Sequence, residues 1–289
     1  MEVQLVVDAK ATLGEGPTWD HRTQRLYWVD IVEKKIHIYD PKKNETSQIP
    51  VDHQIGAVVV RESGGFIAAT ENGFYAINEQ GEQTLIVDPE KELPHNRFND
   101  GKCDPVGRFW AGTMHFDEDK PTGSLYVLDR DLTVRKMLTG ITISNGLAWT
   151  SDQKTMYYID SPTKQVAAFD FDLETGELTN KRIVVTIPDG EGIPDGMTID
   201  ADGNLWVAQW GGYKVSKWNP HTGEKLGEIK VPAKQVTSCV FGGENLDELY
   251  ITSARRGLDE KELEAYPHSG GLFRVKTDVK GTESVFFKG

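Results

Sequence analysis

Short apolar runs alternate with polar residues along almost the whole chain, at the two-residue spacing that is typical of β-strands. Clusters of turn-forming residues separate the runs, such as ESGG at 62–65 and NPHTGE at 219–224. Only the segment RRGLDEKELEAYP at 255–267 predicts a helical turn or two, on an outer connection. The expected strands are 25–30, 35–40, 56–60, 65–70, 73–78, 108–113, 123–129, 155–160, 165–172, 204–209, 248–253 and 271–276. The pattern therefore predicts an all-β protein.

One motif recurs six times, as in NGLAWTSDQKTMYYID from Asn145 and DGMTIDADGNLWVAQ from Asp195. Its equivalent positions are Gly16, Gly56, Gly101, Gly146, Gly196 and Cys239, which are separated by 40, 45, 45, 50 and 43 residues. This period fits one blade of a β-propeller. The sequence thus predicts a single domain over residues 1–289, a six-bladed β-propeller with four-stranded antiparallel blades.

The ring must also be closed, because an open ring would expose two unpaired sheet edges. The segment VQLVVD at 3–8 precedes the first copy of the motif and has no blade of its own. We expect this N-terminal strand to close the last blade, beside GLFRVK at 271–276 and the final segment ESVFFK at 283–288.

A closed ring brings equivalent positions of all blades together around one axis. The residues just before the repeat positions are Glu15, Ile55, Asp100, Asn145, Asp195 and Ser238. Glu15, Asn145 and Asp195 offer only oxygen atoms, which suit a hard divalent cation, and three protein ligands leave positions open for water and a substrate.

The residues just before the repeat positions have an alternative explanation, because they could form tight turns. Asp-Gly and Asn-Gly are typical turn sequences, so that Asp100, Asn145 and Asp195 could serve the backbone alone. Glu15 occupies the same position and is not a favoured turn former, which favours the metal site.

The segment HNRFNDGK at 95–102 has a polar character of its own. Arg97 and Asn99 flank Phe98, and alternation in an extended segment puts both polar side chains on one face. They either position an oxygen-rich ligand or belong to a solvated loop.

Composition narrows the classes of function. The net charge of −13 and the pI of about 5.0 oppose binding to nucleic acid or to anionic membranes. Two cysteines, Cys103 and Cys239, do not indicate a disulfide framework. The chain opens without a secretory pattern or a segment long enough to span a bilayer, so we expect a cytoplasmic protein. Its acidity favours a monomer.

Several motifs together resemble one family. LGEGPTW from Leu13, RFNDGK with DPVGRFWAGTM, SNGLAW from Ser144 and PDGMTIDADGNLWVA from Pro194 are similar, in order and spacing, to the regucalcin and gluconolactonase family, also called the senescence marker protein family. The resemblance implies one divalent metal ion, with Ca²⁺ ahead of Mg²⁺, Mn²⁺ and Zn²⁺, held by Glu15, Asn145 and Asp195. It implies hydrolysis of small sugar lactones, with Asp195 as ligand or base and with Arg97 and Asn99 binding the substrate.

One position departs from the family pattern. Aligning GTM places Asp117 where the animal-type relatives have a glutamate that binds the substrate, and Asp is one methylene shorter. Asp117 is therefore the expected substrate-binding residue of this loop, with His115 or Glu118 as alternatives. Two other functions stay open: hydrolysis of another class of ester or lactone, and calcium binding without turnover.

Overall fold

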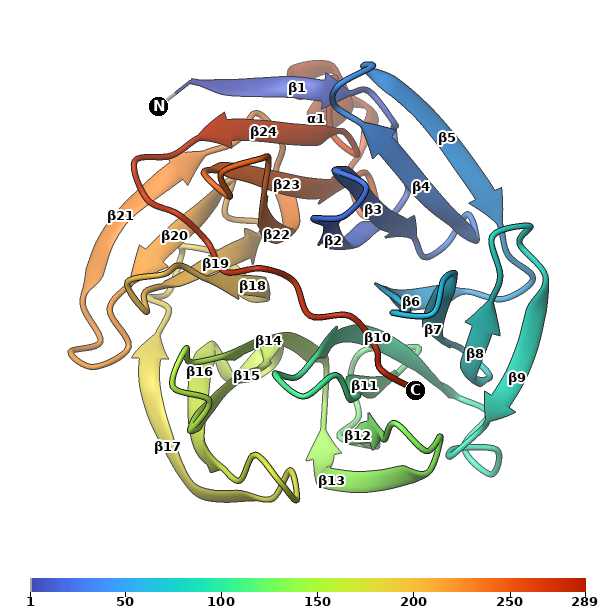
Figure 1. Ribbon diagram of the computed structural model, residues 1–289. Coiled ribbons are helices and arrows are strands. Elements are labelled where there is room, and N and C mark those ends of the chain that lie inside the picture. Colours follow the sequence, from blue (N-terminus) through green and yellow to red (C-terminus); the bar gives the residue numbers. More distant parts are fainter. Residues whose placement is uncertain (1) are drawn as a thin grey trace.

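The computed structural model describes residues 2–289, which form six four-stranded antiparallel sheets arranged as blades around a central axis (Figure 1). The first three blades are β2 (Gly14–Asp20), β3 (Arg25–Asp30), β4 (Lys35–Asp40) and β5 (Glu45–Pro50); β6 (Ile55–Val60), β7 (Phe66–Thr70), β8 (Gly73–Ile77) and β9 (Gln83–Val87); and β10 (Asn96–Cys103), β11 (Phe109–His115), β12 (Gly123–Leu128) and β13 (Val134–Ile141). The next two are β14 (Ser144–Trp149), β15 (Thr155–Asp160), β16 (Gln165–Phe171) and β17 (Leu178–Thr186); and β18 (Ile193–Ile199), β19 (Leu205–Trp210), β20 (Lys214–Trp218) and β21 (Lys225–Lys230). The predicted six-bladed β-propeller is confirmed.

The last blade combines the two ends of the chain. It contains β22 (Gln235–Gly242), β23 (Glu248–Ala254), β24 (Leu272–Lys276) and, outermost, β1 (Val3–Val7). β1 runs antiparallel to β24, with Val3 opposite Val275 and Leu5 opposite Phe273. The predicted closure by the N-terminal strand is therefore confirmed.

The prediction for ESVFFK is wrong. With β1 in place the last blade has its four strands, and the C-terminal segment instead crosses the centre of the ring toward β10 and β6 (Figure 1). Phe287 pairs with Arg61 in a parallel bridge, and its backbone N–H donates to the carbonyl of Val60 at 2.9 Å. The apolar side chains of Phe286 and Phe287 are buried against other blades, which explains why this run is not an edge strand.

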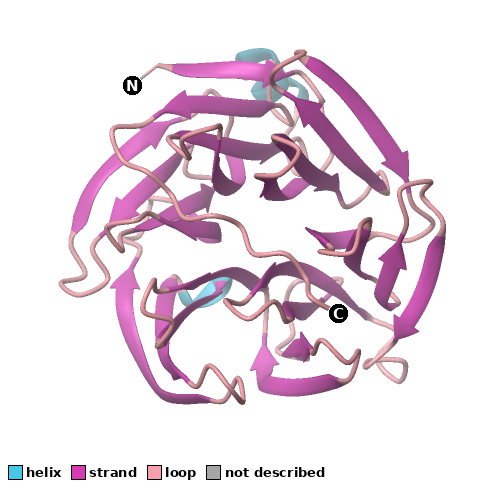
Figure 2. Cartoon of the chain, viewed as in Figure 1, coloured by secondary structure: helices cyan, strands magenta, loops and turns pink. Residues whose placement is uncertain are grey.

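Within residues 2–289, helical structure is limited to two short elements (Figure 2). α1 (Glu260–Ala265) lies in the segment for which a helical turn was predicted, and Asp259 caps it. The turn η1 (Ser161–Thr163) follows β15. Among residues 2–289, no helix has the length and apolar character needed to cross a membrane.

The repeated motif encodes a distortion of the innermost strand of each blade. In β2, β6, β10, β14, β18 and β22, the pairing with the second strand slips at or next to the repeat position. Such bulges re-aim side chains and are common beside functional sites. The alternative interpretation as tight turns is wrong, because Glu15, Asp100, Asn145 and Asp195 all lie inside strands.

Five of the six repeat positions are glycine because the inner strands of neighbouring blades approach closely. A Cβ atom at Gly56 would lie 2.5 Å from the carbonyl oxygens of Phe98 and Asn99 on the next blade. A Cβ at Gly146 would lie 2.9 Å from the carbonyl oxygen of Asp195. These contacts keep neighbouring blades close enough for side chains at the repeat position to meet.

Candidate metal centre and pocket

A pocket of about 130 Å³ lies against the inner strands of several blades. Five of the six predicted site residues line it: Glu15 on β2, Arg97 and Asn99 on β10, Asn145 on β14 and Asp195 on β18. The sixth, Asp117, does not. The rest of the wall consists of Leu13, Met114, Glu118, Ile143, Ser161, Ile193, Pro194, Trp210 and Arg256.

Glu15 and Asp195 bring two carboxyl groups together in this pocket. Both side chains are buried, and they are close enough to interact through a hydrogen bond when one of them carries a proton. Burial, and secondly the negative charge of Asp100, raise the pKa of Glu15 from 4.5 to about 8. Burial and the charge of Glu15 raise the pKa of Asp195 well above its usual range. Two buried like charges of this kind would be stabilised by a cation between them.

Asn145 adds an amide oxygen to the two carboxyl groups. Its Nδ2 donates to Oγ of Ser161 at 2.8 Å, and that hydroxyl donates to the carbonyl of Pro194 at 2.7 Å. Because Ser161 holds the amide nitrogen of Asn145, the amide oxygen Oδ1 faces away from Ser161. Two carboxylates and one amide oxygen form a donor set that fits a hard divalent cation.

Arg97 and Asn99 form a hydrogen-bonded chain toward this donor set. Arg97 Nη1 donates to Oδ1 of Asn99 at 2.8 Å and to the carbonyl of Phe98 at 3.1 Å. Burial, and secondly the positive charge of Arg256, lower the pKa of Arg97 to about 10. The guanidinium therefore stays charged at neutral pH, and its Nε and Nη2 make no hydrogen bond within residues 2–289. They are available to oxygen atoms of a ligand.

The loop after β11 places Glu118, and not Asp117, on the pocket wall. The side chain of Asp117 is 71% exposed and lies 3.6 Å from Nδ1 of His115. Glu118 has a positive φ of 62°, and its Oε1 lies 2.8 Å from Nη2 of Arg256. The one-residue shift arises in the turn that begins at His115, where the N–H of Glu118 donates to the His115 carbonyl at 3.0 Å.

A second group of possible metal ligands lies in the same loop. Nitrogen or oxygen atoms of His115, Asp117 and Asp119 are all within 4.8 Å of one another. The two aspartates are mostly exposed, and Nδ1 of His115 already accepts a hydrogen bond from the backbone N–H of Asp117 at 3.1 Å. The turn thus accounts for the position of the His115 ring.

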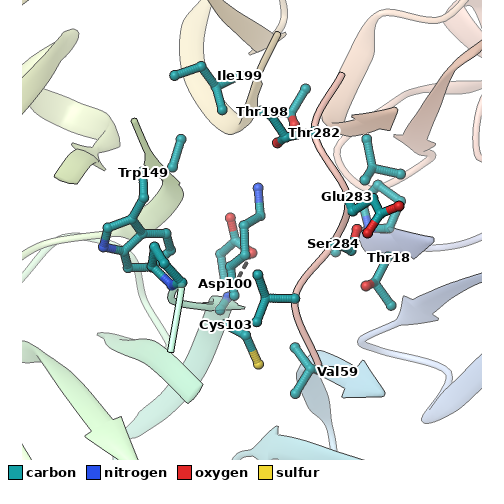
Figure 3. A pocket seen from close by; sticks show the side chains of 18 of the residues that line it. Thr18, Val59, Asp100, Cys103, Trp149, Thr198, Ile199, Thr282, Glu283 and Ser284 are labelled. Atoms are coloured by element: carbon teal, nitrogen blue, oxygen red, sulfur yellow. Dashed lines mark hydrogen bonds between the residues drawn. The ribbon is translucent and has the colours of Figure 1, made fainter. Parts of the chain in front are cut away.

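Asp100, the remaining carboxylate of the repeat, lines a different cavity of about 210 Å³ (Figure 3). Figure 3 shows Asp100 across this cavity from the C-terminal segment with Thr282, Glu283 and Ser284. Lys102 is half-buried beside Asp100 and donates from Nζ to the carbonyl of Met197 at 2.7 Å. Asp100 thus influences the pocket through its charge.

Sequence reasoning missed Arg256, Ser161 and Lys102. Arg256 lies in an irregular loop after β23, outside the six copies of the recurring motif. Ser161 follows β15 and has no counterpart in the recurring motif. Lys102 belongs to the RFNDGK segment. Arg97 and Asn99 were predicted because side chains alternate along a strand, but the bulge in β10 interrupts this alternation before Lys102.

The fold and this pocket define a six-bladed β-propeller with an oxygen-rich site where its inner strands meet. The chain belongs to the family described as SMP-30/Gluconolactonase/LRE-like region, which matches residues 13–255. Regucalcin of Xenopus laevis is 41% identical over 100% of this chain and 99% of its own length. A putative sugar lactone lactonase, YvrE, of Bacillus subtilis is 38% identical over 100% of this chain and 99% of its own. The structure of a calcium-binding protein, regucalcin, from Agrobacterium tumefaciens has a TM-score of 0.95 and 28% identity, and covers 99% of this chain and 97% of that one.

Proposed function

We propose that this protein is a divalent-metal-dependent hydrolase that opens small sugar lactones. The observation that carries the proposal is the meeting of Glu15, Asn145 and Asp195 in one pocket with Arg97 and Asn99. The name of the Bacillus relative as a putative sugar lactone lactonase supports the substrate class. The pocket of about 130 Å³ also favours a small substrate, since pockets for drug-sized ligands span about 300–1,000 Å³.

Glu15, Asn145 and Asp195 would hold the ion, which would polarise a lactone carbonyl and lower the pKa of a bound water. Arg97 binds substrate oxygens through Nε and Nη2, and Asn99 keeps the Arg97 guanidinium in place. Asp195 accepts a proton from the attacking water. The ring C–O bond then breaks, its oxygen takes up a proton, and a hydroxy acid leaves.

The test is proton release from D-glucono-1,5-lactone above spontaneous hydrolysis. Protein stripped by a chelator receives Ca²⁺, Mg²⁺, Mn²⁺ or Zn²⁺ in turn, and Ca²⁺ is the expected first choice. We expect turnover to return with metal, and to be absent in purified, folded Glu15→Gln and Asp195→Ala variants. Retained activity in both variants would refute the assignment of the ligands.

Calcium binding without turnover is the second candidate, favoured by the description of the Agrobacterium relative as a calcium-binding protein. It predicts that Ca²⁺ binds to the same three residues while every lactone tested stays intact. The apolar part of the pocket wall, with Leu13, Met114 and Trp210, makes a less polar ester the next substrate to test in that case.

A further inference from the structure

Two arginines line the proposed active site, in different environments. Arg97 is buried on the inner strand β10, whereas the side chain of Arg256 is 39% exposed. Arg256 follows β23, and its backbone N–H donates to the carbonyl of Thr12 at 2.9 Å. The charge of Arg256 has the largest effect of any charged group on the pKa of Arg97, so the two guanidinium groups influence one another within this pocket.

Arg256 is paired with Glu118, and this pair is open to solvent. Its Nη2 lies 2.8 Å from Oε1 of Glu118, whose side chain is 40% exposed. Exposed ion pairs contribute little to stability because water solvates both partners well. Breaking the Arg256–Glu118 pair therefore costs little free energy, and an incoming anion can replace Glu118 on Arg256.

The turn from His115 brings the side chain of Glu118 to the pocket. Glu118 ends this turn with a φ of 62°, one of eleven positive φ values among the non-glycine residues of 2–289. The turn places the Glu118 carboxylate against Arg256 on the pocket wall.

The balance of charge in the pocket favours an anion once a metal is bound. Glu15 and Asp195 contribute two negative charges, which a divalent cation would offset. Glu118 offsets Arg256, so the positive charge of Arg97 remains. A substrate with a carboxylate or phosphate group would meet that charge and, by displacing Glu118, the charge of Arg256 as well.

We propose that Arg256 is a specificity-determining residue, which gives the pocket a subsite for an anionic group on a lactone substrate. The proposal rests on the lactonase function proposed above. The subsite recognises oxyanion chemistry, because a planar guanidinium donates two parallel hydrogen bonds to a carboxylate or a phosphate. Arg97 and Arg256 line the same pocket, so the subsite belongs to the site that holds the proposed substrate-binding arginine.

The ratio of kcat/KM values for an anionic and a neutral lactone tests the subsite. The anionic probes are 6-phospho-D-glucono-1,5-lactone and D-glucaro-1,4-lactone, which separate phosphate from carboxylate, and the neutral probe is D-glucono-1,5-lactone. We expect R256Q to lower the ratio about tenfold to a hundredfold, as the loss of a charge-assisted hydrogen bond predicts. The loss should lie in KM for the anionic probe, and R256K should retain part of the preference.

Arg255→Gln is the matched control, since it removes the same charge from the neighbouring residue, which does not line the pocket. Its ratio should equal that of the unaltered protein. A ratio in R256Q that equals the ratio in Arg255→Gln would overturn the proposal.

Calorimetric binding of the ring-opened acids gives a readout that needs no turnover. We expect 6-phospho-D-gluconate to bind more tightly than D-gluconate, and R256Q to abolish the difference. If no lactone is turned over but 6-phospho-D-gluconate still binds more tightly than D-gluconate, the lactonase function is refuted and the subsite is supported. Turnover of the neutral lactone, with no preference and no effect of R256Q, would support the lactonase and overturn the subsite.

Discussion

Nδ2 of Asn99 donates a hydrogen bond of 3.2 Å to Oδ1 of Asn145, which lies 46 residues further along the chain and on the next blade. The same nitrogen donates to the carbonyl of Ser144 at 2.9 Å, and Oδ1 of Asn99 accepts from Arg97. Asn99 therefore connects the arginine proposed to bind substrate with an oxygen proposed to bind metal.

Asn99→Ala should weaken metal binding and turnover together. Removal of a group that orients a ligand typically costs about 10–100-fold in metal affinity or activity. We expect a change of this size in the Kd for Ca²⁺, measured by calorimetry on chelator-treated protein, and a rise in KM for D-glucono-1,5-lactone because Arg97 loses its acceptor. Asn72→Ala, which removes an exposed asparagine from the connection between β7 and β8, is the control. An unaltered Ca²⁺ affinity in Asn99→Ala would show that the bond to Asn145 does not orient the ligand.

The raised pKa of Glu15 predicts how the stability of the metal-free protein depends on pH. In the folded state this carboxyl group keeps its proton up to a pH of about 8, whereas in the unfolded chain it loses the proton near 4.5. Between these values the folded state binds more protons, so the free energy of unfolding falls as the pH rises. Denaturation in the presence of a chelator, at several pH values across this window, measures the slope.

Glu15→Gln should reduce that slope and should make the metal-free protein more stable at the upper end of the window, because it removes one of two buried like charges. Glu45→Gln, on the exposed strand β5, should leave the slope as it is. Apparent metal affinity should rise over the same window, since an ion must displace the proton. A free energy of unfolding that rises with pH in the metal-free protein would contradict the assignment of a protonated Glu15.

Sequence patterns predicted the middle strands of the blades well, and the outer strands poorly. β3, β7 and β15 lie between neighbouring strands and are almost fully buried, so their residues are strongly apolar. The outermost strands β13 and β17 are mostly half-buried or exposed, and their sequences VRKMLTGI and LTNKRIVVT lack clear alternation. An outer strand is specified mainly by backbone pairing to its neighbour, which leaves a weak signal in the sequence.

The same contrast applies to the site. Glu15, Asn145 and Asp195 could be selected because the ring repeats and because equivalent positions of a closed ring lie near the axis. Glu118 and Arg256 lie in loops that do not repeat, and their pairing depends on the path of two connections that are far apart in sequence. The shift from Asp117 to Glu118 follows from one turn, whose geometry a sequence alignment does not contain.

The C-terminal segment should contribute strongly to stability. Phe287 is fully buried in a cluster with Phe74 and Phe109, and its backbone bonds to Val60 and Glu62 on or beside β6. Phe287→Ala should cost about 3–5 kcal/mol, the usual range for loss of a buried phenylalanine. Lys288→Ala, at the exposed neighbouring position, should change the free energy of unfolding by less than about 0.5 kcal/mol. Equal denaturation midpoints for the two variants would show that the segment crossing the ring is not part of the cooperative fold.

Removal of the residues before Ala9 should both destabilise the protein and promote its self-association. β1 supplies the outermost strand of the last blade, and its loss leaves β24 as an unpaired edge. Leu5 also packs against the core between the last two blades. An exposed edge strand is a template for pairing with another chain, so the truncated protein should melt at a lower temperature and elute as larger species at high concentration. A chain that lacks only the first two residues keeps β1 intact and is the control. If both chains melt at the same temperature and remain the same size, β1 is dispensable for ring closure.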